Sequence, residues 1–104
     1  MRNSIAGWAA ACAAAVAAAP AAAQDQTGRN LAASCAICHG TDGRFATQDS
    51  PLIPLAGLPR DHIAGQLRAF RDGKRPATVM HQIAKGYTDP QIDAIAGWFA
   101  AQRR

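Results

Sequence analysis

Two cysteines and a histidine stand together in the run Cys35-Ala36-Ile37-Cys38-His39. Two thiols one helical turn apart share a helix face, where each could add to a vinyl group on adjacent edges of one porphyrin. The histidine that follows directly would then be held beneath the iron and could coordinate it. The spacing therefore predicts covalent attachment of one haem c through Cys35 and Cys38, with His39 as the proximal iron ligand.

Three other interpretations of these residues remain open, each with less support. A zinc site would want four ligands, and the other histidines, His62 and His81, do not stand in a paired spacing. A thioredoxin-like redox pair would need a βαβ environment, which the sequence does not indicate. A plain disulfide between the cysteines would close a very small loop and stabilise the chain little.

Haem iron in an electron carrier needs a second axial ligand, and Met80 is the candidate. It is the only methionine after Met1 and follows a loop that contains Pro76. A thioether suits iron in both oxidation states, and Met/His ligation raises the reduction potential. His62 and His81 are the alternatives, each giving bis-histidine ligation. We expect His62 on the exposed side of its helix and His81 at the surface or beside the site.

Residues 1–23 have the pattern of a secretory signal peptide. Arg2 supplies a positive charge, the stretch Ile5–Ala19 is uncharged, and three alanines follow Pro20. A retained membrane anchor and a lipoprotein site at Cys12 are the alternatives, although a spanning helix needs about 20 apolar residues. We expect cleavage near Ala23, a periplasmic location, and no stable membrane span after cleavage.

Removal of this leader from the 104-residue chain leaves residues 24–104, with two cysteines. The whole chain has a net charge of +4, from 11 basic and 7 acidic residues. That charge is mild and no basic run interleaves with aromatic residues, so nucleic-acid binding is not indicated. A domain this small buries little apolar surface and usually needs a staple. Residues 24–104 are therefore expected to form one mono-haem domain.

The elements that must position these groups are helices, because no alternating strand pattern of useful length occurs. After a polar lead over 24–27, a helix is expected over 28–34, ending at the cysteine motif. Residues 40–57 are rich in Gly, Pro, Ser, Thr and Asp and predict a long loop. Such a loop is uncommon in a compact domain unless it wraps something.

A second helix should start at Pro59, with an apolar stripe on Ile63, Leu67 and Phe70 and a stop at Gly73. A short helix is expected over 81–85. A last helix should run over about 89–102, because Thr88-Asp89-Pro90-Gln91 combines a capping box with a first-turn proline. Its inward residues should be Ile92, Ile95, Ala96 and Phe99. The predicted fold is all-α, with three main helices and long loops.

With these motifs in place, the chain resembles the class I bacterial cytochromes c over residues 24–104. The matching stretches are Leu31–Gly40, the turn Pro54-Leu55-Ala56-Gly57, and the Met80 loop. The stretch from Phe70 to Met80 is similar to the small c4/c553-type carriers and to the cytochrome subunit of flavocytochrome c sulfide dehydrogenase. The latter resemblance implies a flavoprotein partner that oxidises sulfide and passes electrons to the haem. A free soluble c4/c553-like carrier to a terminal oxidase or other periplasmic redox enzyme is the alternative.

The resemblance implies a class I cytochrome c fold, in which helices and long loops wrap one covalent haem. The first and last helices of that fold cross where a small residue meets an aromatic one. Gly28 with Trp98 or Phe99 suits this contact, because glycine lets two backbones approach closely. Helix capping by Gly28 is the alternative.

The resemblance also implies that His39 donates its other ring N–H to a loop carbonyl near a proline, which fixes the tautomer. Pro51 and Pro54 both lie in the right region, and the sequence does not choose between them.

We expect an electron-transfer protein rather than a catalyst by itself, since no catalytic set of side chains stands out. A haem sensor with an open sixth position is less favoured. Lys74, Arg75 and Lys85 could form a docking ring for a redox partner, or only a solvated basic face. An apolar shell should keep water from the haem and raise its potential. The expected shell residues are Leu31, Ile37, Leu52, Ile53, Leu55, Leu67, Phe70, Ile92, Ile95 and Phe99.

Overall fold

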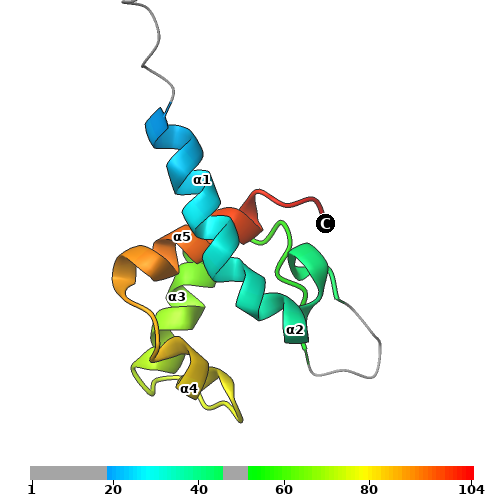
Figure 1. Cartoon of the computed structure of the whole chain (residues 1–104). Coiled ribbons are helices and arrows are strands. Elements are labelled where there is room, and N and C mark those ends of the chain that lie inside the picture. Colours follow the sequence, from blue (N-terminus) through cyan, green and yellow to red (C-terminus); the bar gives the residue numbers. More distant parts are fainter. Residues whose placement is uncertain (1–18, 46–51) are drawn as a thin grey trace, which may run out of the picture.

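The computed structural model describes residues 19–45 and 52–104, with the backbone alone described over 19–25. These parts of the chain contain helices and no strand, which confirms the expected all-α fold. The α-helices are α1 (Ala19–Ala32), α2 (Ala36–His39), α3 (Arg60–Arg71), α4 (Met80–Ala84) and α5 (Asp89–Ala100), as drawn in Figure 1. Among them, none is both long and apolar enough to cross a membrane.

Helix α1 is longer than the sequence predicted. It begins at Ala19, so the expectation of a polar lead over 24–27 is wrong, and the backbone there is helical. Alanine is the strongest helix former, and Pro20 falls in the first turn, where its missing N–H breaks no hydrogen bond. The chain stays helical through a 3₁₀ turn at Ala33–Cys35 and through α2. The cysteine motif therefore ends one nearly continuous helical path.

The second main helix, α3, matches its prediction, with Pro59 as the N-cap instead of a first-turn residue. Ile63 and Ala64 are buried on its inner face, and Gly73 follows its end with a φ of 74°. The short helix α4 starts one residue earlier than predicted, at Met80, and ends at Ala84.

The last main helix, α5, starts with the predicted capping box. The Thr88 side chain accepts a hydrogen bond from the Gln91 N–H, and the Gln91 side chain accepts one from the Thr88 N–H. Two orphan donors of the first turn are thereby satisfied. The helix ends at Ala100, two residues before the predicted end.

Helix α5 packs against both α1 and α3, and the core lies between these three helices (Figure 1). Gly28 lies inside α1 and faces Ala94 and Trp98 of α5. The predicted helix crossing is thus confirmed, with Trp98 as the aromatic partner, and the capping alternative for Gly28 is wrong. The buried core residues are Ala32, Ile63, Ala64, Ile92, Ile95, Ala96 and Phe99.

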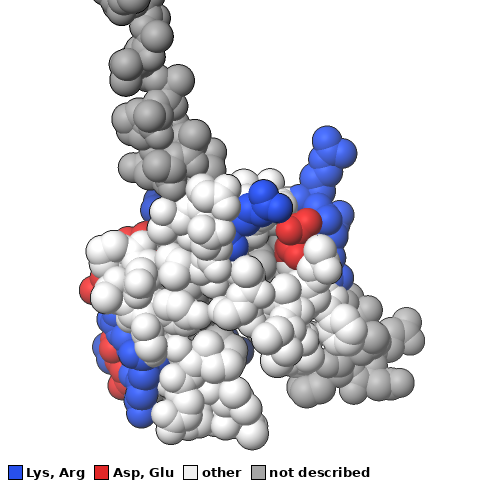
Figure 2. Space-filling model, viewed as in Figure 1, with Lys and Arg blue, Asp and Glu red and all other residues white. Residues whose placement is uncertain are grey.

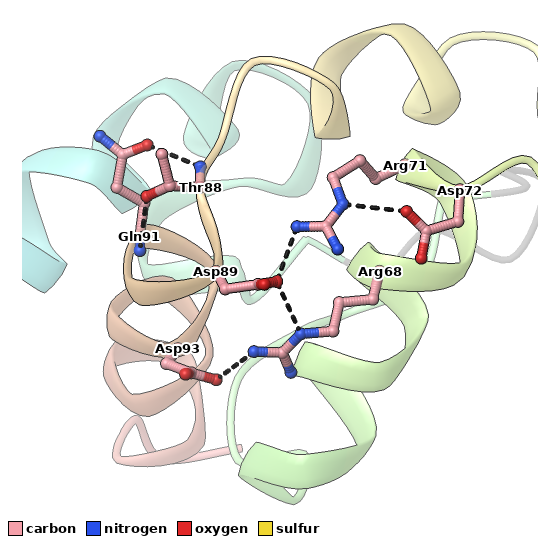
Figure 3. A network of polar contacts seen from close by, with 7 residues as sticks. All are labelled: Arg68, Arg71, Asp72, Thr88, Asp89, Gln91 and Asp93. Carbon is pink, nitrogen blue, oxygen red and sulfur yellow. Dashed lines mark hydrogen bonds and ion pairs between the residues drawn. The ribbon is translucent and has the colours of Figure 1, made fainter.

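A polar network joins α3 to α5 on the outside of the core (Figure 3). Arg68 bonds to Asp89 at 3.1 Å and to Asp93 at 2.8 Å, and Arg71 bonds to Asp89 at 2.7 Å. The side chains of the two aspartates are exposed and those of the two arginines are half-buried at the surface, so each pair contributes little stability alone. Because the pairs share partners, they fix the angle at which α3 meets the start of α5.

Candidate functional site

A cavity of about 870 Å³ is lined by residues of the cysteine motif, of α3, α4 and α5, and of the segment 52–58. All four predicted site residues, Cys35, Cys38, His39 and Met80, line it. In Figure 2 a notch separates the lobe that carries α4 from the lobe that carries α2, and the described surface around it is largely uncharged. The fold thus brings together side chains that stand more than 40 positions apart in the sequence.

The two thiols lie one helical turn apart, at the end of the path from α1 into α2. Cys35 is half-buried, Cys38 is exposed, and both are free, so the plain disulfide is not formed in this structure. Burial raises the pKa of the Cys35 thiol, while a hydrogen bond with Ser34 acts in the opposite direction. Both sulfurs are therefore available, at the cavity wall, for bonds to a ligand.

Ile37 corrects the predicted shell. This residue is 87% exposed. Residues two apart on a helix do not share a face, so a turn that directs Cys35 and Cys38 to the cavity directs Ile37 away from it.

The ring of His39 is fixed by a backbone carbonyl. Its Nδ1 lies 2.8 Å from the carbonyl oxygen of Ile53. A carbonyl can only accept, so Nδ1 carries the proton and donates it, which leaves the lone pair on Nε2 free to bind a metal. The carbonyl belongs to the peptide between Ile53 and Pro54, so of the two candidate prolines Pro54 is the one next to the acceptor. Pro51 lies outside the described residues.

Two glycines shape the turn that makes this hydrogen bond possible. Gly40 directly follows His39 and has a φ of 81°, which favours glycine. Gly43 has a φ of 75°, and its carbonyl accepts hydrogen bonds from the N–H groups of Leu55 and Ala56. These two hydrogen bonds hold the segment that starts at Leu52 against the turn after His39. The role of these two glycines was not predicted, although their spacing after His39 was a usable signal.

Met80 is half-buried in the cavity wall as the first residue of α4. Its two competitors differ in position. His62 is exposed, as expected, but also lines the cavity, while His81 is not part of the lining. The Nδ1 atom of His81 is buried without a hydrogen-bond partner. Of these three residues, Met80 and His62 are the ones that face the cavity.

The rest of the wall is mainly apolar. Seven predicted shell residues line it, while Leu31 and Ile92 belong to the adjoining core. The seven are Leu52, Ile53, Leu55, Leu67, Phe70, Ile95 and Phe99. The prediction missed Leu58, Pro76, Val79, Ile83 and Tyr87, which also line the cavity. Three of the lining residues, Ile53, Val79 and Ile83, are 49%, 54% and 39% exposed. A flat apolar group bound in the cavity would cover part of this exposed apolar surface.

Tyr87 connects the wall near α4 to the cysteine motif. Its hydroxyl lies 2.9 Å from the Ser34 hydroxyl, which itself donates to the Leu31 carbonyl. Because the one Ser34 proton is already used, Tyr87 is the donor. This contact joins the loop before α5 to the 3₁₀ turn Ala33–Cys35 that follows α1.

The predicted docking residues separate into two kinds. Lys74 and Lys85 are exposed. Arg75 is half-buried in the cavity wall, with its guanidinium 4.6 Å from the Phe70 ring centroid and donating to Gln66. Arg75 therefore belongs to the wall and not to a solvated basic face.

The residues of the cavity fit haem c. Two free thiols with the right spacing, an imidazole with an oriented Nδ1–H and a thioether all line a cavity of apolar side chains. Sulfur and imidazole nitrogen are the donors expected around haem iron.

Comparison with known proteins gives relatives of one kind. No family model matches the chain. It is 42% identical over 76 residues to the cytochrome subunit of sulfide dehydrogenase from Chlorobaculum tepidum, across 72% of this chain and 66% of the relative. It is 41% identical over 69 residues to a thiosulfate dehydrogenase electron acceptor from Thiomonas intermedia, across 66% of this chain and 31% of the relative.

A third relative is covered over nearly its whole length. The chain is 33% identical over 79 residues to cytochrome c-554(548) from Halomonas halodenitrificans, across 72% of this chain and 92% of the relative. The first two relatives are longer, and the chain spans only 66% and 31% of them.

Proposed function

Because the chain belongs to the class I c-type cytochromes and carries haem c, we propose that Cys35 and Cys38 bind that haem through thioethers, with His39 and Met80 as its axial ligands. One observation carries this assignment: these four side chains line one apolar cavity. Residues 24–104 are the single mono-haem domain of this proposal.

The bound haem supplies one-electron exchange at its iron. The chain contributes an environment that changes little between the two oxidation states. The Ile53 carbonyl holds the proton on Nδ1 of His39, so the lone pair of Nε2 would be available to the iron in either oxidation state. The apolar wall keeps water away and disfavours the more highly charged oxidised state. If Met80 and His39 held the iron in both oxidation states, the structural change on electron transfer would be small.

As its electron donor we propose a flavoprotein sulfide dehydrogenase, to which this chain would be the cytochrome subunit. The relative from Chlorobaculum tepidum, at 42% identity, supports this choice. The second candidate is a free carrier that serves another periplasmic redox enzyme. The match to cytochrome c-554(548) favours it, because the region shared with this chain makes up 92% of a protein that is named as a cytochrome and not as a subunit.

Purification of the exported protein tests both the covalent haem and the identity of the electron donor. The expected result is a coloured protein whose mass equals the chain plus one covalent haem and whose spectrum changes on reduction. A colourless protein with the mass of the bare chain would overturn the haem assignment. Co-purification with a flavoprotein, together with sulfide-dependent reduction of the haem, supports the subunit. A cytochrome that purifies alone and is not reduced by that flavoprotein supports the free carrier.

The leader is a separate proposal. We propose that residues 1–23 direct export to the periplasm and are removed before Gln24. The mass of the exported chain should correspond to a start at Gln24. A chain that starts upstream of Pro20 would contradict this cleavage.

A further inference from the structure

Two parts of the chain supply the proposed haem ligands, and both line the cavity. The attachment turn, residues 34–39, carries the two cysteines and His39, and the Met80 segment, residues 76–87, carries Met80. They contain the helices labelled α2 and α4 in Figure 1. An iron bound from both parts can keep both ligands only if the two parts hold a fixed position relative to each other.

The Met80 segment has few polar attachments of its own. Within the described residues, no side chain from Pro76 to Gly86 makes a hydrogen bond or an ion pair. Helix α4 has five residues and no side-chain cap, and a helix this short has little stability of its own. The N–H of Tyr87 donates to the Ala84 carbonyl at 3.2 Å, so the end of α4 is tied to Tyr87.

Tyr87 bonds the Met80 segment to the attachment turn. Its hydroxyl lies 2.9 Å from the Ser34 hydroxyl and donates to it, because the Ser34 proton is used by the Leu31 carbonyl. In the described chain this is the one hydrogen bond between residues 31–45 and residues 74–87. The acceptor side is firm, since Ser34 lies on the nearly continuous helical path from α1.

We propose that the Tyr87–Ser34 bond holds the Met80 segment against the attachment turn, and that Tyr87 thereby keeps Met80 on the haem iron against competing ligands. This rests on the proposed haem site and on Met80 as its second axial ligand. Tyr87 is a positioning residue, because it acts on the iron through Met80. Displacement of the thioether requires the Met80 segment to move, and loss of the Tyr87–Ser34 bond adds to the cost of that movement. Imidazole, a good ligand for iron, measures this cost, because it binds only where the thioether has left.

The test is the imidazole affinity of the oxidised, haem-loaded protein. Tyr87→Phe removes the hydroxyl and keeps the ring, so it should raise the affinity about fivefold, the factor given by the typical net contribution of one hydrogen bond. Thr78→Val is the matched control, because it removes an exposed hydroxyl of the Met80 segment that has no partner in the described chain. Its affinity should stay within about twofold of wild type.

Two further variants separate this role from general destabilisation. Ser34→Ala removes the same bond from its other side, so it should match Tyr87→Phe, and the double variant should go no further than either alone. Asp93→Asn breaks an ion pair between α3 and α5 outside the cavity lining. It should lower resistance to urea and leave the imidazole affinity unchanged. Without imidazole, Tyr87→Phe should keep the near-infrared sulfur-to-iron band, and it should lose that band at a lower imidazole concentration than wild type.

Wild-type affinity in both Tyr87→Phe and Ser34→Ala would overturn the proposed role of the bond. Strictly additive effects of these two substitutions, or an equal gain in Thr78→Val or Asp93→Asn, would do the same. If Tyr87→Phe does not load haem, Ser34→Ala decides alone. The underlying site fails differently: a wild-type protein without covalent haem refutes the haem site. A Met80→Leu variant that binds imidazole no more tightly than wild type refutes Met80 as the ligand.

Discussion

A Cβ atom on Gly28 would stand 2.8 Å from the backbone carbonyl oxygen of Ala94. Helices α1 and α5 therefore meet at this point almost backbone to backbone. The contact fixes α1, which ends next to the cysteine motif, on the helix that supplies most of the buried core. A side chain at this position would have to push apart the two helices.

Gly28→Val should consequently destabilise the haem-loaded protein by about 1–3 kcal/mol, the usual range for overpacking. The matched control is Gly65→Ala on α3, where an added Cβ meets nothing within 4 Å. That change should raise stability by about 0.5–1 kcal/mol through helix propensity alone. Thermal unfolding followed at the haem band measures both. A Gly28→Val variant as stable as wild type would show that the crossing is not tight.

Replacement of Met80 tests the second axial ligand. Met80→Leu should abolish the near-infrared sulfur-to-iron band of the oxidised protein and lower its reduction potential, because a thioether ligand raises that potential. His62→Gln and His81→Gln are the controls, and both should keep the band. If the band survives in Met80→Leu, Met80 is not the ligand.

Single cysteine variants test the covalent attachment. Cys35→Ser and Cys38→Ser should each leave one vinyl group unreacted, so the haem remains attached by one thioether and its pyridine haemochrome band moves to longer wavelength. The double variant should release haem into acidified organic solvent. An unchanged haemochrome in either single variant would exclude that cysteine from attachment.

The ion-pair network between α3 and α5 should make the stability of the protein depend on pH in the acid range. Hydrogen bonds from Arg71 and Arg68 lower the pKa of the Asp89 carboxyl. A carboxyl with a lowered folded-state pKa contributes stability above its ordinary pKa of about 4 and loses that contribution as the pH falls through the lowered value. Asp89→Asn should therefore reduce stability at pH 7 and weaken its dependence on pH in the acid range.

The control for this prediction is a double-mutant cycle. Arg71→Gln alone should also reduce stability at pH 7, and it should add less in the presence of Asp89→Asn than in wild type. Urea unfolding across the acid range measures both effects. Strict additivity of the two substitutions would show that the Arg71–Asp89 contact contributes nothing.

Local patterns predicted the parts of the fold that depend on neighbouring residues. The box at Thr88 and Gln91 gave the start of α5 correctly, because both of its hydrogen bonds lie within one turn. The stop at Gly73 was also correct, since a positive φ favours glycine. The start of α1 was missed because residues 1–23 were assigned to a leader and 24–27 to a polar lead, although alanine favours helix and proline fits a first turn.

The candidate site followed the same division. The cysteine motif and Met80 were visible as residue types at informative spacings, and all line the cavity. The carbonyl of Ile53 and the inward turn of Arg75 were not, because each depends on contacts between segments far apart in the chain. Ile37 was misplaced because its apolar side chain was considered without the direction that the helical turn imposes.

The structure holds the two proposed iron ligands, His39 and Met80, with different numbers of supporting contacts. The Nδ1 atom of His39 is hydrogen-bonded to the Ile53 carbonyl oxygen at 2.8 Å. Met80, in contrast, is the first residue of a five-residue helix whose N-cap, Val79, makes no side-chain hydrogen bond. Helices this short have little stability of their own. Under heat or denaturant the proposed bond between Met80 and the iron should therefore break first. Unfolding would then pass through a species in which only His39 still coordinates the metal.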